Sequence, residues 1–140
     1  MKKALRALAA GAVLVGSLNA AAVAEKKDAR SELMKEMRVM MEAMEQIQRG
    51  GLTNSSEEMK AGVTKLQGTL SSLESEDVKV ILPKDQAYAY KFVQKTASML
   101  RLYSDDMILS IGAGRMDDAL DDYTQLLKQC TSCHIRIRNW

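Results

Sequence analysis

Turn-forming residues are scarce in this chain, and this scarcity limits its possible folds more than any other sequence feature. The 140 residues include a single proline, Pro83, and eight glycines. A β-sandwich or β-barrel, which needs a turn about every 8–12 residues, is therefore disfavoured. Hydrophobic residues make up 46% of the chain and charged residues 27%, which excludes collagen, low-complexity arrays and typical disordered segments. The sequence predicts an all-α fold made of long helices.

Residues 1–24 have the features of a cleaved secretory signal peptide. A basic start is followed by an apolar, acid-free stretch at residues 7–18 and by a small-residue cleavage site, Ala22-Val23-Ala24. An uncleaved membrane anchor and a buried helix are the competing interpretations, although the apolar stretch is shorter than the ~20 residues of a membrane-spanning helix. The leader resembles bacterial ones, so we expect cleavage after Ala24 and a periplasmic location.

Removal of the leader changes the charge of the chain. The formal charge of +2 includes the three basic residues of the leader, so residues 25–140 carry a charge of −1. This leaves no basic surplus for nucleic-acid binding. Nothing downstream of the leader is apolar enough to span a membrane.

Residues 25–140 are predicted to form one domain, an antiparallel up-down four-helix bundle. Apolar residues recur every three to four positions in four stretches, at about 25–48, 55–73, 85–111 and 116–137. The expected core positions of the first two stretches are Leu33, Met37, Met40, Met44, Ile47, Met59, Val63, Leu66, Leu70 and Leu73. Those of the last two are Phe92, Val93, Leu100, Tyr103 or Ser104, Met107, Ile111, Met116, Leu120, Tyr123, Leu127, Cys130, His134 and Ile137.

The predicted helices are separated by recognisable boundary signals. Gly50-Gly51 and the glycines at 112 and 114 are expected to end the first and third helices. A capping box from Ser55 to Glu58 is expected to begin the second. Residues 75–84 form the one irregular connection, in which 78–82 is a candidate extended segment.

Both cysteines and the only histidine lie within five consecutive residues, Cys130-Thr131-Ser132-Cys133-His134. On a helix, positions i, i+3 and i+4 share a face, so Cys130, Cys133 and His134 are expected to project together into the bundle. The spacing Cys-x-x-Cys-His is the attachment signal of c-type haem, in which the thiols add to the vinyl groups and the imidazole binds iron. The export signal supports this interpretation, since haem c is attached outside the cytoplasm.

Other interpretations of the cysteine pair remain open. Cys130 and Cys133 could form a short-loop disulfide or a thioredoxin-like redox pair, although the βαβ context of the latter is missing. A zinc site would need a carboxylate as its fourth ligand, because the sequence holds no other cysteine or histidine.

A haem iron bound by His134 has its second axial position on the opposite side, where a methionine thioether is a known ligand. The first predicted helix offers five candidates: Met34, Met37, Met40, Met41 and Met44. A methionine stripe at helical spacing is more commonly core filler, so we expect most of them to pack in the interior. Their spacing alone does not choose between them.

A four-helix bundle with Cys-x-x-Cys-His near its C-terminus resembles the class II c-type cytochromes, cytochrome c prime and its low-spin Met/His relatives. In that family the residue opposite the histidine follows an arginine by four positions and precedes a helix-ending glycine by about sixteen; here Arg30, Met34 and Gly50 fit. The resemblance therefore implies Met34 as the second iron ligand. Arg138, four residues after His134, matches a family arginine.

The resemblance also implies roles for the two arginines. Arg30 and Arg138 are candidates to lie beside the haem propionates and the histidine; the alternative is that both are solvated surface charges. The chain departs from the family at Ile137, where Tyr or Phe is usual, and at Gln86, near a frequent tryptophan. Both departures concern haem packing and neither concerns a ligand.

The implied function is periplasmic one-electron transfer by one covalent, six-coordinate His/Met haem c, with redox proteins as partners and no enzymatic activity. The alternative is a five-coordinate, cytochrome c prime-like protein that binds NO or CO, and a third possibility is a haem-free module that binds a partner. Lys128, Arg136 and Arg138 form a basic cluster that could dock an acidic redox partner, or simply a solvated helix face. The resemblance further implies a homodimer formed through the first two helices.

Overall fold

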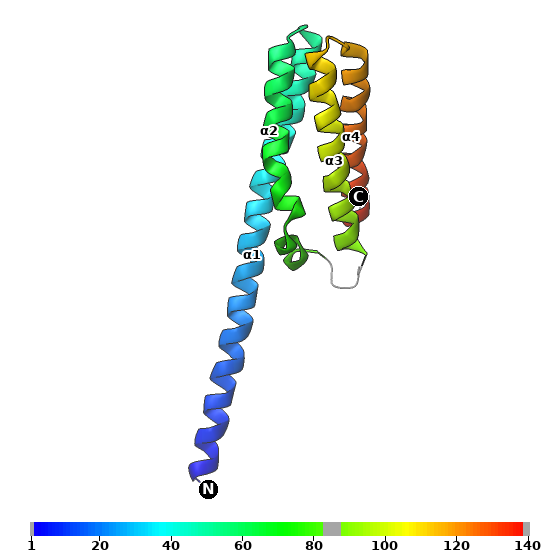
Figure 1. Ribbon diagram of the computed structural model, residues 1–140. Helices are drawn as coiled ribbons and strands as arrows, with labels where there is room; N and C mark the ends of the chain where they lie inside the picture. The colour runs from blue at the N-terminus through cyan, green and yellow to red at the C-terminus, as the bar shows by residue number, and fades with distance from the viewer. Residues whose placement is uncertain (1, 83–87, 139–140) are drawn as a thin grey trace.

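The computed structural model describes the backbone of residues 2–82 and 88–138 and the side chains of residues 23–82 and 88–137. Over these residues the chain is all-helical and has no strand. The helices are α1 (Lys2–Leu52), α2 (Ser56–Glu74), the short 3₁₀ helix η1 (Glu76–Val80), α3 (Ala89–Gly112) and α4 (Met116–Arg138). Consecutive long helices run antiparallel, and α1 projects well beyond the other three at its N-terminal end (Figure 1). The prediction of an all-helical chain with four long helices is confirmed.

In the described part of the chain, no helix is both long and apolar enough to cross a bilayer.

The end of α1 differs from the prediction. The helix continues through Gly50 and Gly51 to Leu52, and the chain turns at Asn54, which has a left-handed φ of 54°. Gly50 instead permits a close approach, because a Cβ there would lie 2.6 Å from the backbone nitrogen of Met59. Gly50 thus allows α1 to pack closely against the start of α2, and Asn54 adopts the left-handed conformation of the turn.

The start of α2 confirms half of the predicted capping box. The backbone N–H of Glu58 donates to the hydroxyl of Ser55 at 3.3 Å. The Glu58 carboxylate accepts a hydrogen bond from Nε of Arg49 at 2.6 Å, so its side chain joins α2 to α1.

The connection after α2 is not extended. Residues 76–80 form η1, whose first turn is capped by the Ser75 hydroxyl accepting from the backbone N–H of Asp77 at 3.1 Å. Val78 and Leu82 are buried, so this connection contributes to the core. The start of the third predicted helix, with Asp85 and Gln86, lies outside the described residues.

The core is formed mainly by aliphatic residues and methionine. All five predicted stripe residues of α2 are buried, and so are Met40 and Ile47 of α1 and Val93, Leu100 and Met107 of α3. Small residues that the apolar spacing did not identify are also enclosed: Ala43, Ala89, Ala97, Ala119 and Thr96. They allow the helix backbones to approach one another closely. Of the two predicted alternatives Tyr103 and Ser104, Ser104 is the buried one.

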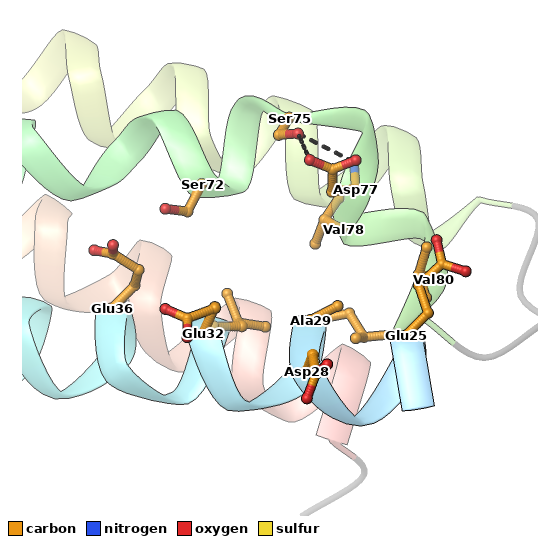
Figure 2. Close-up of a pocket in the computed structure, with 12 residues that line it drawn as sticks. Glu25, Asp28, Ala29, Glu32, Glu36, Ser72, Ser75, Asp77, Val78 and Val80 are labelled. Carbon is orange, nitrogen blue, oxygen red and sulfur yellow. Dashed lines mark hydrogen bonds between the residues drawn. The ribbon is translucent and has the colours of Figure 1, made fainter. Parts of the chain in front are cut away.

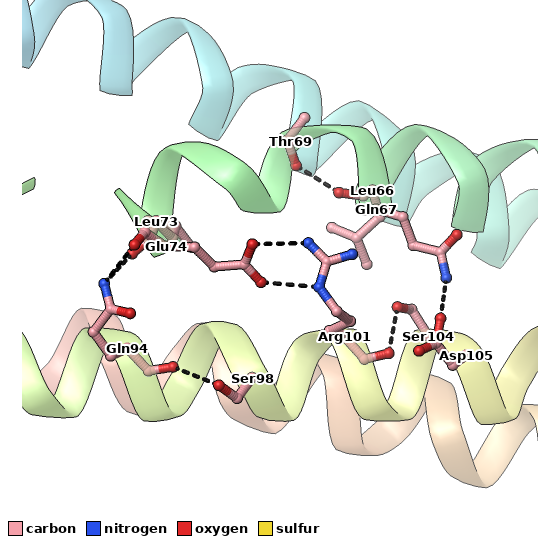
Figure 3. Close-up of polar contacts among 10 residues, drawn as sticks. All are labelled: Leu66, Gln67, Thr69, Leu73, Glu74, Gln94, Ser98, Arg101, Ser104 and Asp105. Carbon is pink, nitrogen blue, oxygen red and sulfur yellow. Dashed lines mark hydrogen bonds and ion pairs between the residues drawn. The ribbon is translucent and has the colours of Figure 1, made fainter. Parts of the chain in front are cut away.

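Polar side chains join α2 to α3 along one edge of their contact (Figure 3). Arg101 donates two parallel hydrogen bonds to the Glu74 carboxylate, at 2.9 and 3.0 Å, and the Gln67 amide donates to Asp105 at 2.7 Å. The Gln94 amide donates to the backbone carbonyls of Leu73 and Glu74. These bonds satisfy carbonyl groups at the end of α2 and fix its register against α3.

The helix pairs do not all pack equally. Consecutive helices contact each other along their lengths, whereas α1 and α4 approach each other at only a few positions. The fourth side of the bundle is therefore open between α1 and α4.

The predicted core stripe of α4 is wrong at Leu120 and Leu127, both of which are 47% exposed. The buried positions are instead their preceding neighbours, Ala119 and Leu126. The helix is rotated toward α3, with which it packs closely, and away from α1. Because of this rotation Cys133 packs against the core and His134 is only half-buried.

Candidate functional site

A cavity of about 370 Å³ lies at the open side of the bundle. Helix α1 contributes Arg30, Met34 and Met37 to its wall, and α4 contributes Cys133 and His134. Residues about 100 positions apart in the sequence therefore meet at one site. The remaining wall is largely apolar and comes from α1, α2, η1, α3 and the end of α4: Leu33, Leu73, Val78, Ile81, Leu82, Val93 and Ile137, with Lys26 the one further charged residue.

Four of the six predicted site residues line this cavity: Arg30, Met34, Cys133 and His134. Cys130, one turn before Cys133, does not line it and packs half-buried against the core. The side chain of Arg138 lies outside the described residues. Met34 is 39% exposed, which places it where the cavity meets solvent.

The methionines of α1 separate into three groups. Met34 and Met37 line the cavity, Met40 and Met44 pack in or against the core, and Met41 is exposed. Spacing in the sequence did not separate them, because the division depends on where α4 lies relative to α1. The structure reduces the candidate thioether ligands from five to two.

Both cysteines are free thiols in an apolar environment. Burial raises the pKa of Cys130 to about 11, with a further contribution from the nearby Cys133, and burial also raises the pKa of Cys133. The thiols of reactive redox pairs have lowered pKa values, so this environment does not favour the thioredoxin-like interpretation.

For the zinc interpretation, no three His, Cys, Asp or Glu side chains among the described residues are grouped so that they could hold a metal ion. The fourth ligand that such a site would require is not supplied by a neighbouring carboxylate in this part of the chain.

The last turn of α4 is tied to α3 by an aromatic contact. The guanidinium carbon of Arg136 lies 4.8 Å from the centroid of the Phe92 ring, within cation–π range. Arg136 follows His134 by two residues, so this contact restrains the helix turn that carries the imidazole. Of the predicted basic cluster, Lys128 and Arg136 are exposed on α4.

A second hollow of about 620 Å³ lies between α1 and the α2–η1 segment (Figure 2). Its wall is rich in carboxylates, those of Glu25, Asp28, Glu32, Glu36 and Asp77. It shares Leu33, Val78 and Ile81 with the first cavity, so the two hollows lie on either side of these apolar residues.

Several cavity residues carry no functional signal in the sequence. Val78 and Leu82 belong to the irregular connection, and Leu73 and Val93 are part of ordinary helical stripes. Val78 and Leu82 reach the site because η1 folds back beside α1, and apolar periodicity within a helix does not report such a contact.

No protein-family model, curated protein or solved structure matches the chain.

Proposed function

We propose that the chain is a periplasmic haem c protein that transfers single electrons, with Cys130 and Cys133 as attachment residues and His134 and Met34 as iron ligands. The observation that carries this proposal is the cavity between α1 and α4. It has the imidazole of His134 and the sulfur of Cys133 on one wall, methionine sulfur on the other, and an apolar floor. Haem c needs two thiols for attachment and nitrogen and thioether ligands for iron, and the cavity wall supplies one thiol, the imidazole and the thioether. The second thiol, that of Cys130, lies one turn before Cys133 and is half-buried against the core.

Each residue then has a defined task. Cys130 and Cys133 would hold the cofactor on α4 through their sulfur atoms. His134 is held on a helix turn that the Arg136–Phe92 contact restrains. Met34 reaches the site from α1, and its thioether would raise the reduction potential. Arg30, exposed at the cavity wall, supplies a cation that can pair with a carboxylate at the rim.

When bound, haem supplies the one-electron couple, and the chain supplies a site that changes little on electron transfer. The apolar wall lowers the local dielectric, and close packing of α2 with α1 and α3 keeps the floor fixed. A site closed by His134 and Met34 leaves no open position for a substrate, so we propose no catalytic residue.

The five-coordinate alternative is favoured by one observation, the exposure of Met34. A side chain that is 39% exposed could lie above the cavity without filling it. In that case an exogenous ligand such as NO or CO would occupy the side opposite His134.

Optical spectroscopy of the exported protein tests the proposal. We expect a covalent haem stain on denaturing gels, lost in Cys133→Ser, and a low-spin spectrum with the charge-transfer band of methionine ligation. Met34→Ala should give a high-spin spectrum and a lower reduction potential, whereas the matched variant Met41→Ala, an exposed methionine outside the cavity, should change neither.

Three results would contradict parts of the proposal. Absence of Soret absorption would remove haem and leave a partner-binding module. A high-spin spectrum with ready CO binding would support the five-coordinate alternative. An unchanged spectrum in Met34→Ala would transfer the ligand assignment to Met37, the other methionine of the cavity.

A further inference from the structure

The cavity contains one more sulfur donor than a haem needs. A six-coordinate His/Met iron uses one thioether, yet both Met34 and Met37 line the wall. Cys133 and His134 lie on the same cavity from α4. The site of the haem-free chain therefore combines two thioethers, a thiol and an imidazole.

This donor set is soft. Soft thioether and thiolate sulfurs favour Cu(I), zinc and iron–sulfur clusters, and imidazole is also a suitable copper ligand. Hard cations prefer oxygen, but the nearby carboxylates belong to the separate hollow between α1 and the α2–η1 segment. The described residues also lack a group of three His, Cys, Asp or Glu side chains of the kind zinc uses.

We propose that the haem-free chain binds one Cu(I) ion in this cavity, through the sulfurs of Met34, Met37 and Cys133 and the imidazole of His134. No electron is transferred in this step. The Cys133 thiol releases its proton to solvent as the copper–sulfur bond forms, while the thioethers and the imidazole nitrogen donate lone pairs.

Two features of the cavity leave the donors room to adjust around an ion. Methionine has three rotatable side-chain bonds, and Met34 is 39% exposed rather than locked in the core. Helices α1 and α4 contact each other at few positions, so this side of the bundle can narrow around an ion without disrupting the packing of consecutive helices.

Copper and haem would exclude each other, because both need Cys133 and His134. The inference does not depend on the proposed electron transfer, since it concerns the chain before a cofactor is attached. It assigns Met37 a role that haem ligation leaves unexplained.

The test is a titration of the full chain, produced without haem, with Cu(I) under anaerobic, reducing conditions. A chromophoric Cu(I) chelator serves as competitor and reports the affinity. We expect one bound ion for each chain. The double variant Met34→Leu/Met37→Leu, which keeps the side-chain volume but removes both thioethers, should bind at least about tenfold more weakly.

Two matched controls identify the site. Met41→Leu changes an exposed methionine of the same helix that does not line the cavity, and it should bind as the original chain does. Cys133→Ser should lose at least about tenfold in affinity, whereas Cys130→Ser should retain it within about twofold, because Cys130 does not line the cavity. Circular dichroism checks that every variant keeps its helix content.

Equal losses in Cys130→Ser and Cys133→Ser, with none in the methionine double variant, would overturn the inference and indicate a simple dithiol site. Failure of the original chain to compete for Cu(I) would overturn it as well. Neither result affects haem attachment, which is measured separately on the exported protein, so the two proposals can fail independently.

Discussion

The side of the bundle built around α2 and the open edge between α1 and α4 have similar apolar spacing but different packing. Every stripe residue of α2 is buried, and Gly62 brings α2 against the backbone of α1. On α4, which borders the open edge, the predicted stripe residues Leu120 and Leu127 are each 47% exposed. Apolar periodicity thus identifies residues that can be buried, but the closure of neighbouring helices decides which of them are.

This difference has a functional consequence. An edge that stays open over apolar and sulfur-containing side chains can accept a flat apolar cofactor or a soft metal ion without displacing core residues. The closed side provides the rigid floor, and the open side provides the donors. The experiments below separate the two regions through matched pairs of variants.

The largest effect is expected from two adjacent leucines of α4. Leu126 is completely buried, so Leu126→Ala should lower the free energy of unfolding by about 2–5 kcal/mol through lost apolar burial and a cavity. Leu127 is half-exposed, so Leu127→Ala should cost less than about 1 kcal/mol. Urea denaturation measures both, and a larger loss in Leu127→Ala than in Leu126→Ala would show that α4 has the rotation that its sequence predicted.

Helix α4 shows which features of the fold can be predicted from the sequence and which cannot. The number of long helices, the stripes of α1 to α3 and the C-terminal end of α3 follow from periodicity and capping, which are local. For α4, two stripes share Met116, Tyr123, Cys130 and Ile137, and the larger leucines favour the wrong one. Only the packing partner, α3 rather than α1, decides the rotation.

The site was predictable to a similar degree. Arg30, Met34, Cys133 and His134, which motif and resemblance selected, all reach one cavity. The role of Met37 and the contributions of Val78 and Leu82 could not be predicted, because they depend on contacts between distant segments. Signal cleavage, haem attachment and dimer formation stay predictions.

The next largest effect is expected from two glycines of α2. A Cβ on Gly62 would lie 2.8 Å from a side-chain carbon of Ile47 and 2.9 Å from the backbone oxygen of Ala43, so Gly62→Ala should lose about 1–3 kcal/mol of stability. Gly68 has no neighbour within 4 Å, and Gly68→Ala should gain about 0.5–1 kcal/mol from helix propensity. Opposite signs in thermal or urea unfolding would confirm the close approach of α1 and α2; a gain in both would contradict it.

The open edge can be probed by pH in the haem-free chain. Burial raises the pKa of Cys130 to about 11, above the ~8.5 of an unfolded thiol. Between these values the unfolded chain loses the proton and the folded chain keeps it, so stability is full below about pH 8.5 and falls as pH rises toward 11. We expect Cys130 to account for up to about 3 kcal/mol of this fall, at about 1.4 kcal/mol for each pH unit between the two pKa values.

Because tyrosines and lysines titrate in the same range, the informative quantity is the difference between the chain and Cys130→Ser. The serine variant should show the shallower decline between pH 8.5 and 11. Parallel curves would mean that the Cys130 thiol is accessible to solvent. The open edge between α1 and α4 would then extend as far as this residue.

The smallest effect concerns the closed contact between α3 and α4, where packing brings like charges together. Burial, followed by the nearby carboxylates of Asp106, Asp118 and Asp121, raises the pKa of Asp122. The ionised form is therefore disfavoured in the folded protein, and the stability that protonation provides is lost as pH rises through the folded pKa. Asp122→Asn mimics the protonated form, so it should gain about 0.2–0.5 kcal/mol at neutral pH, the range of an i,i+4 like-charge pair such as Asp118–Asp122.

The gain should disappear below the unfolded pKa of about 3.9 and shrink in high salt, as urea denaturation at each condition would show. A gain in stability that persists in acid would instead be due to hydrogen bonds of the asparagine amide. The packing of α3 against α4 would then cause no electrostatic destabilisation at Asp122.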